Sequence, residues 1–294
     1  MNTSCARVAM GKPALRYTYS MKAKKHLGQH FLKSSSALKK IVDVAAVTSN
    51  DTILEIGPGT GALTELLLVT AKKVIAIEKD RELIPLLEEK FAKEIAAGKL
   101  QLLEADILTF DPSLFRPGLK SYKLVANIPY YITGAIIEKF LSTACQPALM
   151  VLLIQKEVAE RIIARDGKES ILSTAVKAYG KPKIIAKVPP GAFVPPPTVD
   201  SAILSIEGIS RDFFVSPRHS SGEAEAGCDE KLFFAVMKSI FGKKRKQIGG
   251  SLAEFLQNKD LALSALAKAG IDTKTRPEDI DLQTWKKLIQ AVGK

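Results

Sequence analysis

Up to about residue 206, the hydrophobic residues of this chain occur in two patterns, and beyond residue 228 they occur mainly in one of them. In the first part, short runs of aliphatic residues alternate with stretches in which hydrophobic residues recur every three or four positions. The runs predict strands over residues 52–56, 74–77, 100–103, 123–126 and 148–154. The stretches predict helices over residues 35–47, 62–70, 81–97, 134–143 and 156–164. This alternation is typical of βαβ units and predicts an α/β fold with a doubly wound, parallel sheet.

The pattern changes toward the C-terminus. Residues 183–188 and 201–206 predict two more strands, and the proline-rich stretch between them predicts a stiff loop, because proline cannot donate to a sheet ladder. Residues 210–228 are rich in serine, glycine and charge, and hydrophobic residues then recur only at helical spacing. The later helices are expected over residues 233–241, 249–257, 261–268 and 282–292.

These patterns predict four segments. Residues 1–20 are expected to form a disordered basic extension, residues 21–208 a catalytic domain, residues 209–228 a linker and residues 229–294 a small all-α domain. A chain of 294 residues with 46% hydrophobic content is long enough to bury one sizeable core beside such a second domain.

Charge favours a polyanionic partner. The chain has 43 Lys and Arg residues against 31 Asp and Glu residues, a formal net charge of +12. A surplus of this size favours nucleic acid or an anionic membrane surface, and nucleic acid is the leading candidate. No acidic residue precedes Asp43, and basic residues interrupt the N-terminal region before an apolar signal segment can form.

Several classes of protein are disfavoured by what the sequence contains. The longest strongly apolar run, residues 148–154, is too short to span a bilayer. The three cysteines are scattered without a C-x-x-C pair, and the three histidines lack metal-ligand spacing. We therefore expect reduced thiols, no metal, no membrane partner and a cytoplasmic location.

A glycine-rich loop follows the first strand of the predicted sheet. Gly57, Gly59 and Gly61 lie between that strand and the next helix, where the backbone can approach a ligand closely. Glu55 directly precedes the loop and brings a negative charge that disfavours a pyrophosphate at the helix N-terminus. S-adenosylmethionine (SAM) has no phosphate and carries a sulfonium and an ammonium, so an acidic residue there suits it better than a dinucleotide.

Two further acidic residues follow the next two strands. Glu78 ends the strand over residues 74–77, where a carboxylate would accept hydrogen bonds from ribose hydroxyls of either NAD or SAM. Asp106 follows the third strand, where it would accept from the adenine amino group of the cofactor. In isolation, Asp106 is also typical of a helix N-cap or an Asx turn.

The segment 127–130 (NIPY) follows the fourth strand at the sheet edge where ligands bind in this architecture. It could be a plain turn, since Asn and Pro both favour turns. An exocyclic adenine amine, however, is a poor nucleophile that needs hydrogen-bond acceptors, such as the Asn127 side-chain oxygen and a backbone carbonyl at Ile128 or Pro129. Tyr130 would stack on the base, and Phe193 could close its opposite face, each contact contributing roughly 1–3 kcal/mol.

Five segments in the same order along the chain resemble one family, the rRNA adenine N6,N6-dimethyltransferases of the bacterial KsgA type. They are residues 28–32 (GQHFL), 55–64 (EIGPGTGALT), 127–133 (NIPYYIT), 155–161 (QKEVAER) and 195–202 (PPPTVDSA). The resemblance runs from about Lys24 to the C-terminus. It implies a Rossmann-like class I SAM methyltransferase domain followed by a small helical domain.

The resemblance also implies site residues and a substrate. The implied SAM contacts are His30, Leu32, Gly57, Glu78, Asp106 and Asn127, although the family often has Asn where His30 stands. The implied substrate is a pair of adjacent adenosines in a hairpin near the 3′ end of small-subunit (16S) rRNA in the immature 30S subunit, each dimethylated during ribosome biogenesis. We expect a monomer with no metal. This chain departs from the family in residues 1–20, which precede the usual start, and in residues 166–173.

Basic clusters near both ends of the chain are candidates for RNA contact. Four consecutive cations repel one another unless phosphates neutralise them. The residues expected to bind RNA are Lys24, Lys25, Lys243, Lys244, Arg245 and Lys246.

Three other functions remain open from the sequence. An antibiotic-resistance methylase acting on large-subunit rRNA shares the NIPY and proline-rich elements. A non-catalytic ribosome-assembly factor would not need the intact set of Asn127, Tyr130 and Phe193. A dehydrogenase is supported only by the glycine loop and Glu78.

Overall fold

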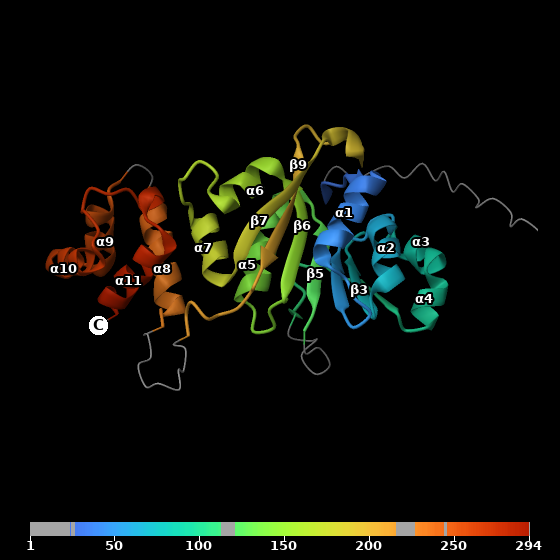
Figure 1. Cartoon of the computed structure of the whole chain (residues 1–294), viewed down its shortest axis with the longest axis horizontal. Helices are drawn as coiled ribbons and strands as arrows, with labels where there is room; N and C mark the ends of the chain where they lie inside the picture. The colour runs from blue at the N-terminus through green and yellow to red at the C-terminus, as the bar shows by residue number, and fades with distance from the viewer. Residues whose placement is uncertain (1–23, 25–26, 113–120, 216–226, 244–245, 294) are drawn as a thin grey trace, which may run out of the picture.

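The structure is a computed structural model that describes residues 24, 27–112, 121–215, 227–243 and 246–293. Its centre is a seven-stranded sheet in the order β4-β3-β2-β5-β6-β9-β7 (Figure 1). The strands of this sheet are β2 (Thr52–Ile56), β3 (Lys73–Glu78), β4 (Leu100–Glu104), β5 (Lys123–Asn127), β6 (Leu149–Gln155), β7 (Lys181–Val188) and β9 (Ser201–Glu207). The predicted α/β fold is confirmed, and the expected extension over residues 1–20 lies outside the described residues.

Helices cover both faces of the sheet because successive strand residues point to opposite sides. On one face, Ile53, Val74 and Val125 pack against α1–α4. On the other face, Leu54, Ile75 and Leu124 pack against α5–α7. The covering helices are α1 (Ser35–Ala45), α2 (Ala62–Thr70), α3 (Ile84–Lys90), α4 (Ala92–Ala96), α5 (Thr133–Ser142), α6 (Lys156–Ile163) and α7 (Ile171–Tyr179).

The sheet is mixed rather than wholly parallel, which corrects the sequence-based expectation. Strands β4, β3, β2, β5 and β6 are parallel, but β9 runs antiparallel to both β6 and β7. The proline-rich loop also contains regular structure: η4 (Pro190–Ala192) leads into β8 (Phe193–Val194), which pairs with β1 (Phe31–Leu32). This small ladder brings the N-terminal motif beside the proline-rich motif.

Helical structure differs from the expectation at two places. The helix expected over residues 81–97 is divided into α3 and α4, because the backbone leaves helical geometry at Phe91 (φ −113°, ψ 25°). The Phe91 side chain is buried and packs against Gly61, where an added Cβ would lie 2.5 Å from the ring. Helix α7 was not expected. It begins with a capping box in which Ser170 and Ser173 satisfy each other's backbone N–H groups.

The C-terminal helices form an all-α unit at one end of the molecule, beyond α7 (Figure 1). They are α8 (Glu230–Phe241), α9 (Ile248–Leu256), α10 (Lys259–Ala269) and α11 (Leu282–Val292), with η5 (Pro277–Asp279) before the last. Their core, which includes the fully buried Trp285, is continuous with the core beneath α5–α7. Phe213 and Phe214 pack edge-on against Phe233 at the junction, so part of the expected linker belongs to the packed interface. The exact domain boundary stays a prediction.

Candidate active site

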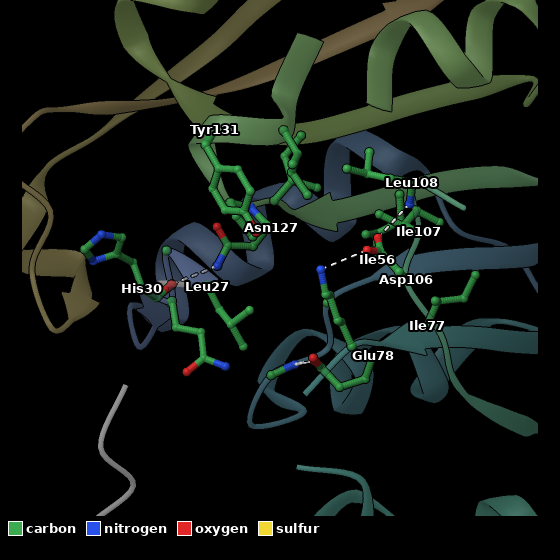
Figure 2. A pocket seen from close by; sticks show the side chains of 18 of the residues that line it. Leu27, His30, Ile56, Ile77, Glu78, Asp106, Ile107, Leu108, Asn127 and Tyr131 are labelled. Carbon is green, nitrogen blue, oxygen red and sulfur yellow. Dashed lines mark hydrogen bonds and ion pairs between the residues drawn. The ribbon is translucent and has the colours of Figure 1, made fainter. Parts of the chain in front are cut away.

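A cavity opens at the C-terminal ends of β2, β3, β4 and β5, and residues 27–31 form one of its walls (Figure 2). Strand order places the loops after β4, β3, β2 and β5 side by side along one edge. The cavity therefore collects side chains that are far apart in sequence, including Glu78, Asp106 and Asn127. Ligands bind at this edge in open α/β sheets.

Glu78 is held firmly in the cavity wall. Its two carboxylate oxygens accept hydrogen bonds from the backbone N–H groups of Gly59 (3.1 Å) and Asp80 (2.8 Å). Burial raises the pKa of Glu78, and these two hydrogen bonds oppose that rise. The side chain is thus preorganised, and the oxygens retain lone pairs that can accept from vicinal hydroxyls.

Asp106 lines the same cavity as Glu78, and its carboxylate makes two contacts. One carboxylate oxygen accepts from the backbone N–H of Leu108 (2.9 Å), which is the Asx turn considered from the sequence. The other forms an ion pair with Lys79 (2.8 Å), and this hydrogen bond is the main cause of the lowered pKa of Asp106. A ligand amino group must share this oxygen with Lys79 or displace the lysine. Lys79 was not predicted as a site residue from the sequence, although its position directly after Glu78 was an available signal.

Asn127 has a defined orientation. Its side-chain amide nitrogen donates to the backbone carbonyl of His30 (3.1 Å; Figure 2). Because the nitrogen is committed to His30, the amide oxygen is the group that remains to accept from a substrate. This orientation is compatible with the acceptor role expected for Asn127, which stays a prediction.

Tyr130 and His30 form a pair beside Asn127. Their rings stack with centroids 5.8 Å apart and an interplanar angle of 23°. The Tyr130 hydroxyl lies 2.6 Å from the Ser201 hydroxyl, and the His30 Nδ1 atom lies 2.8 Å from the Pro195 carbonyl oxygen. These contacts fix the Tyr130 ring in the cavity wall, where a stacking partner is expected.

Phe193 does not line this cavity. It pairs with Leu32 in the β8–β1 ladder, and its side chain is only 1% exposed because it packs into the core beneath α1. The structure therefore does not bring Phe193 onto the cavity surface, and its stacking role stays a prediction. Leu32 is also mostly buried. It lines a smaller hollow behind the glycine loop together with Gly57 and Asn127.

Tyr131, which the sequence analysis did not assign to the site, stands at the cavity rim with 61% of its surface exposed. It lies against Gly28, whose φ of +61° and close approach both favour glycine, since a Cβ there would lie 3.3 Å from the Tyr131 ring. The glycine in the 28–32 motif therefore makes room for an aromatic ring at the cavity mouth.

Glu55 does not carry the full negative charge that was expected from the sequence. Its side chain is 1% exposed, and Oε2 has no hydrogen-bond partner among the described residues. Burial raises the pKa of Glu55 to about 8, so the group is mostly neutral near pH 7 in this structure. Glu55 nevertheless lines the hollow behind the glycine loop, where an approaching cation would favour the ionised form of its carboxyl group.

We expect Glu55→Gln to stabilise the fold more at pH 8 than at pH 5. The folded-state pKa is raised to about 8 from an ordinary value of 4.5, so folding is increasingly opposed as pH rises through this window. The variant removes that cost, which can reach ~5 kcal/mol at most. Chemical denaturation of both proteins at several pH values measures the difference, and a stability difference that does not change with pH would contradict the assignment.

The candidate RNA-binding cations have acidic neighbours. Lys24 pairs with Asp80 (2.7 Å) and Glu82 (3.1 Å), so its charge is neutralised within the protein, which argues against the expected RNA contact. Lys243 and Lys246 lie 2.6 Å and 3.8 Å from Glu254. The remaining candidates, Lys25, Lys244 and Arg245, lie outside the described residues.

The described residues contain neither a candidate metal site nor a candidate membrane span. No group of three or more His, Cys, Asp or Glu side chains is arranged to hold a metal ion within the part of the chain that the structure describes. Nor does any helix in the described ranges have the length and apolar character needed to cross a membrane.

Comparison with known proteins gives consistent matches over nearly the whole chain. Residues 20–293 match the family model described as "Ribosomal RNA adenine dimethylase". A protein named "Ribosomal RNA small subunit methyltransferase A" from Dehalococcoides mccartyi (strain CBDB1) is 43% identical over 271 residues, covering 92% of this chain and 88% of the relative. A protein of the same name from Clostridium botulinum (strain Kyoto / Type A2) is 38% identical over 276 residues, covering 93% and 95%.

Solved structures agree with the fold. A dimethyladenosine transferase from Plasmodium falciparum superposes with a TM-score of 0.74 at 26% identity, covering 90% of this chain and 98% of that one. The 23S rRNA methyltransferase ErmE superposes with a TM-score of 0.67 at 24% identity, covering 90% and 100%, a likeness that concerns the fold alone.

Proposed function

Because this chain belongs to the ribosomal RNA adenine dimethylase family, we propose that it transfers methyl groups from SAM to the N6 atoms of two adjacent adenosines in small-subunit (16S) rRNA. Each adenosine receives two methyl groups while the immature 30S subunit is assembled. The enzyme acts as a monomer and without a metal ion. The observation that carries this proposal is the position of Asn127 beside a cavity suited to SAM: its amide nitrogen donates to His30, and within the described residues its amide oxygen remains available to accept.

The cavity residues fit the cofactor. Glu78 presents a preorganised carboxylate for two ribose hydroxyls, and Asp106 presents an acceptor for an adenine amino group. Glu55 lines the hollow behind the glycine loop, and its buried Oε2 has no hydrogen-bond partner among the described residues, which suits a positively charged amino-acid group nearby. His30, Leu32, Gly57 and Asn127 complete the proposed SAM contacts. When bound, SAM supplies an electrophilic methyl group on a sulfonium.

The residues of this chain prepare the target amine for attack. The Asn127 amide oxygen and a backbone carbonyl of residue 128 or 129 accept from the two N–H groups of adenine. These hydrogen bonds strengthen as the nitrogen becomes tetrahedral and positive, so they stabilise the transition state more than the flat ground-state amine. Tyr130 holds the extruded base by stacking. The amine proton becomes acidic once the methyl group arrives, so a strong base is not required.

In this proposal, lysine side chains hold the RNA by its phosphate groups, at some distance from the adenine that is methylated. We expect Lys243→Gln/Lys246→Gln to weaken RNA binding about tenfold and to reduce the slope of log affinity against log salt by about 1–2, because each phosphate contact releases a counterion. SAM affinity should not change. Filter binding to rRNA over a range of salt concentrations, with calorimetry for SAM, measures both quantities.

Glu254→Gln is the matched control for this surface. Lys243 and Lys246 both face Glu254, and RNA phosphates must compete with its carboxylate. Removing the carboxylate charge should strengthen RNA binding where neutralising the lysines weakens it. Equal loss of SAM and RNA binding in the lysine variant would show that the substitution disturbed the fold instead.

The proposed function is tested by methyl transfer from labelled SAM to immature small subunits, with the modified nucleotides identified by mass spectrometry. Dimethyladenosine at two adjacent small-subunit positions is the expected product. Incorporation into large-subunit rRNA instead would support the antibiotic-resistance type of methylase. Absence of incorporation despite RNA binding would support a non-catalytic assembly factor, and NAD retained by the purified protein would support a dehydrogenase.

A further inference from the structure

Asp80 joins the N-terminal motif to the cofactor-binding sheet edge. One of its carboxylate oxygens accepts from the Lys24 ammonium (2.7 Å), and the other accepts from the Gln29 side-chain amide (2.7 Å). The Gln29 amide oxygen in turn accepts from the Lys24 backbone N–H (2.8 Å). Asp80 is only 5% exposed, whereas the Lys24 side chain is 26% exposed, so these contacts form a partly buried arrangement, which we call the Asp80 clasp.

The clasp stabilises the negative charge of the Asp80 carboxylate. Burial alone would raise the pKa of Asp80, but the hydrogen bonds from Lys24 and Gln29 outweigh that effect and lower the pKa. A buried carboxylate needs such partners, because an unpaired charge in this position would strongly destabilise the structure. Lys24 and Gln29 therefore supply the hydrogen bonds that stabilise the ionised Asp80 carboxylate.

Both ends of the clasp lead to groups in the candidate active site. On the sheet side, the Asp80 backbone N–H donates to Glu78, which faces the cavity. On the other side, residues 27–31 continue from the clasp along the cavity wall to His30, whose carbonyl receives the Asn127 amide. The clasp is thus connected through the Asp80 backbone to Glu78, the proposed ribose-binding carboxylate. Through residues 27–31 it is connected to Asn127, the proposed acceptor for the target amine.

We propose that Asp80 is a positioning residue that fixes residues 27–31 over bound SAM and thereby orients Asn127. This inference rests on the proposed function, because it takes SAM to be the ligand of the cavity. Asp80 contacts neither SAM nor substrate in this scheme. It acts through Gln29 and through Glu78.

Asp80 also has a purely local role, since the Glu82 backbone N–H donates to it (3.1 Å) at the turn that precedes α3. An asparagine at position 80 can keep this turn, because its side-chain oxygen still accepts. It cannot accept from Gln29 through its amide nitrogen, however. Asp80→Asn therefore separates the local role from the clasp.

The experiment compares Asp80→Asn with the exchange variant Asp80→Asn/Gln29→Glu in the full chain. In the exchange variant, the introduced asparagine can donate to the introduced glutamate, so the hydrogen bond is restored with donor and acceptor reversed. The introduced glutamate also still accepts from the Lys24 backbone N–H. We expect Asp80→Asn to weaken SAM binding about tenfold in calorimetry without RNA, and to lower kcat at saturating SAM. The exchange variant should recover most of both losses.

Two further variants make the outcome decisive. Gln29→Leu breaks the clasp from the N-terminal side and should reproduce the Asp80→Asn defects without touching the α3 turn. Glu82→Gln removes only the outer, 78% exposed partner of Lys24 and should leave both measurements unchanged. Thermal unfolding of each variant shows whether it is folded.

The proposal is overturned if Asp80→Asn or Gln29→Leu binds SAM as tightly as the unaltered protein, or if the exchange variant is no better than Asp80→Asn. SAM binding is measured without RNA, so these results do not depend on which nucleotide is methylated. Failure of the proposed function would instead appear as methylation at the wrong nucleotide, or as none, in the unaltered protein.

Discussion

Replacing Asn127 with alanine is expected to lower kcat for methyl transfer about 10²–10³-fold, the range found when one preorganised transition-state hydrogen bond is removed. The substitution takes away the amide oxygen that accepts from the target amine. It also releases the His30 carbonyl, whose partner is the Asn127 amide nitrogen at 3.1 Å. RNA affinity should change little, because it depends mainly on cations distant from the base. Single-turnover methylation with labelled SAM, together with filter binding, measures both effects.

Asn127→Asp is the informative control. A carboxylate keeps the acceptor atoms but cannot donate to the His30 carbonyl, so it separates acceptance from positioning. We expect an intermediate rate if both functions of the amide contribute. Turnover by Asn127→Ala close to that of the unaltered protein would remove Asn127 from the catalytic assignment.

The elements of the sheet could be predicted closely because their signals are local. Strands β2 and β5 are short aliphatic runs bounded by polar residues, and the expected bounds differ from the structure by at most one residue. The glycine loop, Glu78, Asp106 and Asn127 then had to meet at one edge, since parallel neighbouring strands end on the same side. Local pattern and general topology were sufficient for this much of the site.

The remaining features depend on contacts between distant segments. Nothing local shows that β9 inserts antiparallel between β6 and β7, because its alternation is compatible with either direction. The burial of Phe193 follows from its pairing with Leu32, which lies 161 positions earlier in the chain. Likewise, Lys24 carries a charge that suggests RNA when considered alone, and only the fold places it beside Asp80.

Glu55 shows a different limit. The sequence places a carboxylate before the glycine loop, but the sign of its effect depends on burial, which raises its pKa to about 8. A group that is mostly neutral near pH 7 and ionised only beside a cation repels an anion less than its formal charge suggests. The preference for SAM therefore depends more on the arrangement of the whole cavity than on this charge alone.

Replacing Glu78 with alanine is expected to weaken SAM binding about 10²-fold. Two hydrogen bonds to ribose hydroxyls are lost, and a hydrogen bond to a charged group contributes about 1.5–3 kcal/mol net, so two at the lower limit account for this loss. The backbone N–H groups of Gly59 and Asp80 also lose the acceptor that now holds the cavity wall. Calorimetric titration with SAM measures the affinity, and an unchanged value would exclude Glu78 from the cofactor site.

Glu78→Gln tests the role of the charge through pH. Burial raises the pKa of Glu78, so the carboxylate becomes protonated at a higher pH than an ordinary glutamate. Protonation converts one acceptor oxygen into a donor, and SAM affinity of the unaltered protein should therefore decrease as pH falls through that pKa. Glutamine cannot titrate, so its lower affinity should lack this component of the pH dependence. If the two proteins respond identically to pH, the carboxylate does not titrate in contact with the ribose, and its role is confined to holding Gly59 and Asp80.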